Sequence, residues 1–335
     1  MRGLWPLVKT AAGVGILVGL VVRWGAQAFV DGLAAIGAGS VLAALALGLL
    51  TTVASAGRWC LVARGLGLRL PLAAAVSDCY RAVFLNSVLP AGVLGDVHRA
   101  VGYGRRIGDM GRGVRVVALE RVTGQLAIVV VGLGVLLTAR PSLLGALLPG
   151  RLGTAELLAC LVALAAAVLW VARDPRAARV RAALRSACVD ARSGVLSRSA
   201  WPGLLALSVV TLAGYLALFV VAARAAGSQA ALGDLLPLLV LGLLAMALPL
   251  NIGGWGPREG VMAVAFGAVG LGAAQGLTTA VVYGVLCLIA CLPGAVVLLL
   301  TASARRLPAP AIPAHRRAPT ARPTSLGGVL ERSPA

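Results

Sequence analysis

The feature that most constrains this chain is a series of apolar runs, each about as long as a lipid bilayer is thick. A helix needs about 20 residues to cross about 30 Å of hydrocarbon. Runs near that length lie at 4–22, 38–57, 116–139, 154–172, 202–223, 235–250 and 276–302. Of the 335 residues, 60% are hydrophobic and 12% are charged, far more apolar surface than a water-soluble core buries. The sequence therefore predicts an all-α, polytopic membrane helical bundle.

The arginines fall in blocks between these runs, and their placement predicts the orientation of the chain. Loops rich in Lys and Arg lie on the cytoplasmic side of a membrane. One block begins with Arg58 after the second run, another precedes the third, and others fill 173–200 and the C-terminal tail. This pattern fits about eight spans in the plasma (inner) membrane with both termini in the cytoplasm, if 257–273 runs outward. It also requires 71–98 to enter and leave from the cytoplasm, as a re-entrant segment or as a hairpin of two short helices.

The chain divides into a transmembrane domain at 1–303 and a tail at 304–335. The tail is rich in Pro and Arg and has no apolar periodicity, so we expect it to be disordered and cytoplasmic. The basic loop at 173–200 can form an amphipathic helix at the membrane surface. The net charge is +19, but the arginines are spread over several loops, so we expect no nucleic-acid partner.

The N-terminal run has a second interpretation, as a signal peptide. Arg2 and Lys9 flank its start, and Ala26 to Ala28 resembles a cleavage site. Arg23 stands between the run and that site, which is unusual for cleavage, so we expect an uncleaved first span.

Two interruptions rich in proline and glycine break the apolar pattern in corresponding places of the two halves. The first reads LPAGVLGD at 89–96, and the second reads LPLNIGGWG at 248–256. Such breaks are tolerated within a membrane only where the backbone is buried in protein or lines a wet cavity. Paired breaks indicate the central site of a transporter and predict a weak internal repeat. The expected hinge residues are Pro90, Gly92, Gly95, Pro249, Gly253, Gly254 and Gly256.

Charged residues accompany both interruptions. A charge at the bilayer centre costs about 2.5–3.5 kcal/mol, so these side chains should face a protein interior or a headgroup. Asp96 and Arg99 are spaced to pair on one helical turn, whereas the adjacent Arg258 and Glu259 should point apart, so that at least one of them needs a partner elsewhere. We therefore expect the two breaks to meet in one charged network that leaves an arginine to hold a lipid phosphate. The candidate binding residues are Asn86, Asp96, Arg99, Glu120, Arg121, Arg258 and Glu259. The alternative is that they are helix-end residues at the cytoplasmic interface, with glycines for tight turns.

Three motifs in order then carry a family resemblance: NSVLPAGVLGDVHR at 86–99, ALERVTG at 118–124 and PLNIGGWGPRE at 249–259. Over about residues 8–303 the chain resembles the lysylphosphatidylglycerol synthase transmembrane-region family. These flippase-like membrane proteins include the membrane half of bacterial multiple peptide resistance factors. The resemblance implies a domain that moves aminoacylated phospholipids or other polar lipids between leaflets. The soluble synthase domain of the full-length factors has no counterpart in the sequence, so this chain should not make the lipid itself.

Three classes of function remain: a lipid translocase, a membrane enzyme acting on a polyprenyl-linked or phospholipid substrate, and an assembly subunit of the cell envelope. No nucleotide-binding loop of the G-x-x-x-x-G-K-[ST] type occurs, so net transport would draw on lipid supply, membrane potential or a coupled ion. With two histidines, and Cys287 and Cys291 far from any other ligand in sequence, we expect no metal and no cofactor. The expected partner is a membrane lipid, whether an anionic or aminoacylated phospholipid or a polyprenyl-linked lipid. The Gly15-x-x-x-Gly19 motif leaves a homo-oligomer open.

Overall fold

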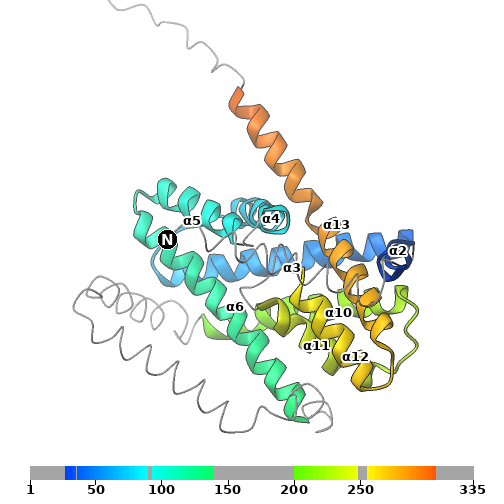
Figure 1. The fold of residues 1–335 in the computed structure, drawn as a ribbon. Helices are drawn as coiled ribbons and strands as arrows, with labels where there is room; N and C mark the ends of the chain where they lie inside the picture. The colour runs from blue at the N-terminus through cyan, green and yellow to red at the C-terminus, as the bar shows by residue number, and fades with distance from the viewer. Residues whose placement is uncertain (1–26, 35, 90–92, 139–199, 248–254, 307–335) are drawn as a thin grey trace, which may run out of the picture. The chain divides into compact units, whose positions relative to one another are not determined.

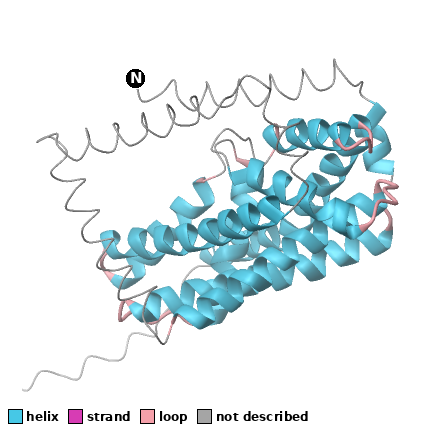
Figure 2. Cartoon of the chain, turned by 90° about the horizontal axis from the view of Figure 1, so that it is seen from below, coloured by secondary structure: helices cyan, strands magenta, loops and turns pink. Residues whose placement is uncertain are grey.

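A computed structural model describes residues 27–34, 36–89, 93–138, 200–247 and 255–306 (Figure 1). Within these ranges nearly every residue is in an α-helix and no strand occurs (Figure 2). The helices are α2 (Gln27–Ala34), α3 (Ala38–Gly65), α4 (Leu72–Val88), α5 (Leu94–Ile107), α6 (Met110–Thr138), α10 (Trp201–Ala225), α11 (Leu232–Ala247), α12 (Pro257–Ala268) and α13 (Ala273–Arg306). The predicted all-α class is confirmed.

Four of these helices, α3, α6, α10 and α13, are long and apolar enough to cross a membrane. They coincide with four of the runs predicted to span, at 38–57, 116–139, 202–223 and 276–302. The runs at 4–22 and 154–172, most of the basic loop and the end of the tail lie outside the described residues. The total of eight spans therefore stays a prediction.

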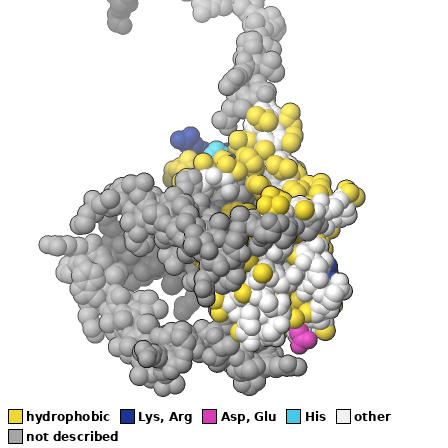
Figure 3. Space-filling model, turned by 45° about the vertical axis from the view of Figure 1, so that its right-hand side comes forward, with side chains coloured by type: hydrophobic (Ala, Val, Ile, Leu, Met, Phe, Trp, Pro, Cys, Tyr) yellow, Lys and Arg dark blue, Asp and Glu magenta, His cyan; other side chains and the backbone are white. Residues whose placement is uncertain are grey.

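The outward faces of the long helices are apolar, as lipid contact requires. Leu42 of α3, Val130 of α6 and Leu205 of α10 are among the large hydrophobic side chains that are more than half exposed. Figure 3 shows hydrophobic side chains spread over the visible described face, with few charged side chains among them. In a water-soluble protein this surface would be an aggregation hazard, whereas in a bilayer it is the solvated face.

Close packing of α3 against α10 forms the centre of the fold; in Figure 1 these are the blue helix and the yellow-green helix labelled α10. Gly214 allows this approach, because a Cβ at that position would overlap the side chain of Thr51. Beside the contact, the rings of Phe219 and Tyr283 stack with centroids 3.9 Å apart, which connects α10 to α13. Small residues and this aromatic pair thus add to the apolar core that packs the long helices together.

The segment predicted at 71–98 folds as a hairpin of two helices, the second of the two alternatives. α4 ends at Val88 and α5 begins at Leu94, and the two helices pack against each other. α11 and α12 form a similar packed pair on either side of the second interruption. α12 has 12 residues, so at about 1.5 Å per residue it spans about 18 Å, less than the hydrocarbon thickness. The outward crossing expected of 257–273 is thus not made by α12 alone.

The same order of helices occurs twice in the described residues: a long helix, a short helix, an interruption, a second short helix and a second long helix. The first series is α3, α4, α5 and α6, and the second is α10, α11, α12 and α13. Glycines with positive φ stand at corresponding turns, Gly67 and Gly227 after the first long helix, and Gly108 and Gly270 after the second short one. These turns need glycine because other residues rarely adopt that backbone conformation.

Substitution of Gly95 tests the contact inside the first hairpin. A Cβ there would overlap the backbone carbonyl of Ala82 in α4, so Gly95→Ala should destabilise the fold by about 1–3 kcal/mol. Gly102, also in α5, has open space around it, so Gly102→Ala should instead gain about 0.5–1 kcal/mol of helix stability. Thermal unfolding in detergent should show midpoints shifted in opposite directions. Equal midpoints would mean that the hairpin does not pack as described.

Candidate functional site

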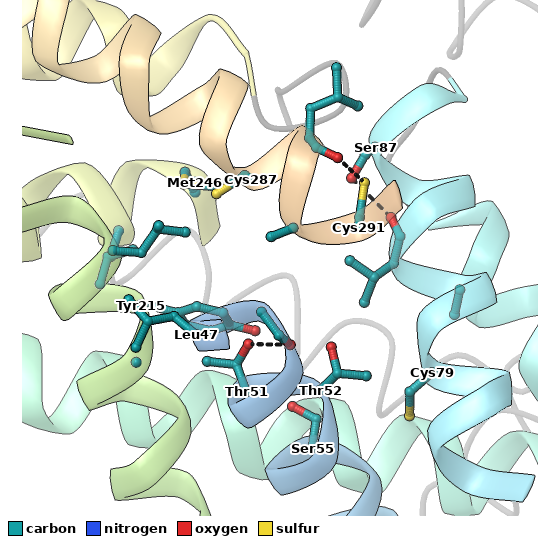
Figure 4. A pocket seen from close by; sticks show the side chains of 18 of the residues that line it. Leu47, Thr51, Thr52, Ser55, Cys79, Ser87, Tyr215, Met246, Cys287 and Cys291 are labelled. Carbon is teal, nitrogen blue, oxygen red and sulfur yellow. Dashed lines mark hydrogen bonds between the residues drawn. The ribbon is translucent and has the colours of Figure 1, made fainter. Parts of the chain in front are cut away.

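A cavity of about 310 Å³ lies among the long helices, the α4–α5 hairpin and the α11–α12 pair. Figure 4 shows part of its wall: Thr51, Thr52 and Ser55 come from α3, Cys79 from α4, and Tyr215 from α10. Other sections of the wall are provided by α5, α6, α11, α12 and α13. A single space is therefore bounded by helices from both halves of the described chain.

The carboxylate of Glu120 holds the first group of charges together. One oxygen accepts a hydrogen bond from Arg58 of α3 at 2.7 Å, and the other accepts one from Arg99 of α5 at 2.7 Å. All three side chains are buried, and Glu120 is only 2% exposed. Since Glu120 lies on α6, this double ion pair ties three helices together at the cavity wall.

Asp96 forms the second half of the same network. It lies 3.3 Å from Arg99, one helical turn away, as the spacing predicted. Arg121 of α6 donates to Asp96 through Nε at 2.8 Å and through a second nitrogen. Asn86, near the end of α4, donates to Asp96 at 2.9 Å and accepts from the N–H of Gly95 at 2.8 Å. Asn86 thus bridges the first interruption and fixes the start of α5.

Arg58 was not among the predicted site residues. The prediction that Arg58 lies in a cytoplasmic loop after the second run is wrong, because α3 continues to Gly65 and Arg58 is buried. The apolar residues WCLVA that follow Arg58 were the available signal, since they extend the apolar helix beyond it. Trp59 is also part of this site, because the guanidinium of Arg99 lies 4.6 Å from the centroid of its ring.

At the second interruption, Arg258 and Glu259 pair with each other. Arg258 donates through Nε at 3.0 Å and through a second nitrogen to one oxygen of Glu259. The expectation that adjacent side chains point apart was therefore wrong. The cause is the start of α12, where the other oxygen of Glu259 turns back to accept the N–H of Gly256 at 2.7 Å. That turn brings the carboxylate beside Arg258. Gly256 itself has φ +108°, which favours glycine.

Aromatic rings enclose Arg258 where it faces the cavity. Its guanidinium carbon lies 5.1 Å from the ring centroid of Trp255 and 5.3 Å from that of Tyr283. Gly284 leaves the room for this arrangement, because a Cβ there would overlap both Arg258 and Trp255. Only 1% of Arg258 is exposed, so its charge is held inside the protein.

The structure therefore brings most of the predicted site residues to one place. Asp96, Arg99, Glu120 and Arg121 line the cavity, and Arg258 lines it from the other half. Asn86 and Glu259 do not line the cavity themselves. Asn86 donates a hydrogen bond to Asp96, and Glu259 accepts one from Arg258. Among the described residues no ion pair joins the two groups directly, so the predicted single network is two networks facing one cavity. Of the expected hinge residues, Gly95 and Gly256 are described, and Pro90, Gly92, Pro249, Gly253 and Gly254 lie outside the described residues.

The rest of the wall combines hydroxyl groups with apolar side chains. Thr51, Thr52 and Ser55 contribute hydroxyls, while Leu218 and Leu243 are apolar. In the described ranges, no three His, Cys, Asp or Glu side chains lie together as metal ligands would. Chemically, the arrangement offers fixed cations and hydrogen-bonding groups within an otherwise apolar bundle.

Comparison with known proteins identifies the family. The family model described as the lysylphosphatidylglycerol synthase TM region matches residues 8–294. The chain belongs to this family. No curated protein matches the sequence. Membership in the lysylphosphatidylglycerol synthase TM region family, together with the four apolar helices, makes this a membrane protein with a lipid-related function.

Removal of the Glu120 carboxylate should be severely destabilising. Glu120→Ala leaves Arg58 without its ion-pair partner and takes from Arg99 its closest one, and breaking a buried pair costs about 3–5 kcal/mol. Asp234 offers a matched control, because it is exposed at the start of α11 and its removal should cost less than about 1 kcal/mol. The measurement is the fraction of purified protein that stays monodisperse on gel filtration after stepwise heating. Similar profiles for the two variants would contradict the central role of Glu120.

Proposed function

We propose that this protein is a lipid translocase, a flippase-like membrane protein that moves a polar lipid between leaflets. The observation that carries the proposal is the shared cavity, in which Arg99 and Arg121 beside the first interruption face the same space as Arg258 beside the second. The family supports a lipid as the substrate.

A polar site within an apolar bundle meets the physical problem of lipid translocation. The acyl chains are well solvated by the hydrocarbon of the bilayer, whereas a phosphate headgroup loses its hydration as it crosses. Fixed guanidinium groups replace that hydration with charge-assisted hydrogen bonds, which are the strong kind for phosphate. A cavity of about 310 Å³ has room for a headgroup, while the acyl chains stay outside along apolar helices.

The repeated order of elements gives the proposal a way to change access. We take α3 to α6 and α10 to α13 as the two members of the weak internal repeat. Movement of one member against the other would expose the cavity to each leaflet in turn, as in transporters built from repeats. The interruptions would be the hinges, with Gly256 among the residues that absorb the backbone change.

The proposed setting is the plasma (inner) membrane, crossed about eight times, with both termini in the cytoplasm. The basic loop at 173–200 would then face the anionic inner leaflet. An enzymatic role is less well supported, because Asp96, Glu120 and Glu259 are each neutralised by an arginine and none is left as a free base. We therefore propose transport without chemical change to the lipid.

Leaflet exchange in proteoliposomes tests the function. The wild-type protein should speed the exchange of acyl-labelled lipids above the rate in empty vesicles. Arg258→Gln should lower that rate by about tenfold or more, because the headgroup loses a charge-assisted hydrogen bond worth about 1.5–3 kcal/mol. Dithionite quenching of the outer-leaflet label gives the rates.

Arg112→Gln is the matched control. Arg112 is exposed on α6 and is not part of the cavity wall, so its loss should leave the exchange rate unchanged. Only variants that elute as wild type on gel filtration are compared. If folded wild-type protein moves no lipid faster than empty vesicles do, the proposed function is wrong, and a search for a chemically altered lipid should follow.

A further inference from the structure

We infer that the cavity selects a headgroup with net negative charge, a phosphate that no ammonium group balances, over an aminoacylated headgroup. This inference rests on the proposed function and names its substrate class. The recognised chemistry is a phosphate ester anion, which a lipid such as phosphatidylglycerol or a soluble compound such as glycerol phosphate both carry.

The charges at the cavity favour an anion. The wall holds four arginines and two carboxylates: Arg58, Arg99, Arg121, Arg258, Asp96 and Glu120. Counting Glu259, which pairs with Arg258 from behind the wall, the described groups still have one positive charge in excess. An anionic headgroup neutralises that excess, whereas a cationic one adds to it.

Among the described residues that line the cavity, an ammonium group finds no free carboxylate. Both oxygens of Glu120 accept from arginines, and Asp96 accepts from Asn86 and lies within ion-pair distance of Arg99 and Arg121. Glu259 is fully buried and accepts from Arg258 and from the backbone of Gly256. A lysyl group would have to displace an arginine from one of these pairs.

Of the three aromatic rings of described residues that line the cavity, those of Trp255 and Tyr283 already contact a cation, and that of Tyr215 is the third. Trp255 and Tyr283 line the cavity, and both rings lie within 5.3 Å of the guanidinium of Arg258. Tyr283 is additionally stacked on Phe219. An aromatic cage for a quaternary or primary ammonium needs several open ring faces. Trp255 and Tyr283 already make cation–π contacts with Arg258, which leaves the ring of Tyr215 alone for such a ligand.

Two buried donors at the site have no acceptor among the described residues. The Nε–H groups of Arg58 and Arg99 make no hydrogen bond, although both side chains are more than nine-tenths buried. Leaving a charged donor unsatisfied in a buried site is costly. Both arginines belong to the cavity wall, but these two Nε atoms are shielded from the cavity, so a phosphate there meets the other atoms of each guanidinium group.

The test compares phosphatidylglycerol with lysylphosphatidylglycerol, both labelled on the same acyl chain so that only the headgroup differs. Two quantities are measured on the full chain: equilibrium binding to the purified protein by fluorescence polarisation, and leaflet exchange in phosphatidylcholine vesicles. We expect phosphatidylglycerol to bind and exchange about tenfold better, equivalent to about 1.4 kcal/mol. Equal or better binding of lysylphosphatidylglycerol overturns the inference.

Two variants tie the preference to named groups. Arg121→Gln removes one cation from a side chain that is 53% exposed, so the fold should tolerate it, and the preference should fall to about threefold or less. Arg112→Gln on the same helix should keep the full preference. An unchanged preference in folded Arg121→Gln contradicts the inference.

The outcomes separate this inference from the proposed function. Selective binding of phosphatidylglycerol without exchange of either lipid would leave the inference standing and refute the translocase. Exchange that favours lysylphosphatidylglycerol would do the reverse. Glycerol phosphate distinguishes the two sources of the anion: its competition with labelled phosphatidylglycerol indicates recognition of the headgroup alone. Competition by unlabelled phosphatidylglycerol only indicates that the acyl chains are needed as well.

Discussion

The double ion pair of Glu120 is the interaction on which the rest of the structure depends. Its two oxygens bind Arg58 and Arg99, so that α3, α5 and α6 meet at one buried carboxylate. Each of these charges alone would be costly in a membrane, and together they are satisfied. The position of α5 in turn fixes Asp96, and with it Arg121 at the cavity wall. The polar site is therefore a consequence of how the charges of the first half are buried.

Small residues make the arrangement sterically possible. Gly95 lets α5 approach α4 at the first interruption, and Gly284 leaves room for Arg258 at the second. Gly214 of α10 lets that helix approach α3 closely, because it has no Cβ to meet the side chain of Thr51. With these contacts, two charged groups face one cavity, and no ion pair between described residues joins them. A site built this way can bind a charged headgroup by its arginines while the helices around it keep apolar faces toward lipid.

Features that depend on local spacing and composition could be predicted from the sequence. Ion pairs between distant residues, and pairs formed by the geometry at the start of a helix, could not. Apolar runs predicted the long helices, and the spacing of Asp96 and Arg99 predicted their pair. Arg58 and Glu120 are 62 residues apart, and nothing local indicates that one is the partner of the other. Arg258 and Glu259 pair because Glu259 caps its own helix, which helix-interior spacing rules do not describe. The hairpin at 71–98 was one of two alternatives, because polar residues in a short apolar segment suit both.

Photocrosslinking can show whether a lipid headgroup occupies the cavity. The probe is phosphatidylglycerol with a photoreactive group on its glycerol headgroup, incorporated with the protein into vesicles, and the labelled residues are mapped by mass spectrometry. If lipid enters the cavity, the labels should fall on cavity residues such as Thr52 of α3 and Gln125 of α6. Labels confined to outward residues of the same helices, such as Leu42 and Val130, would contradict it.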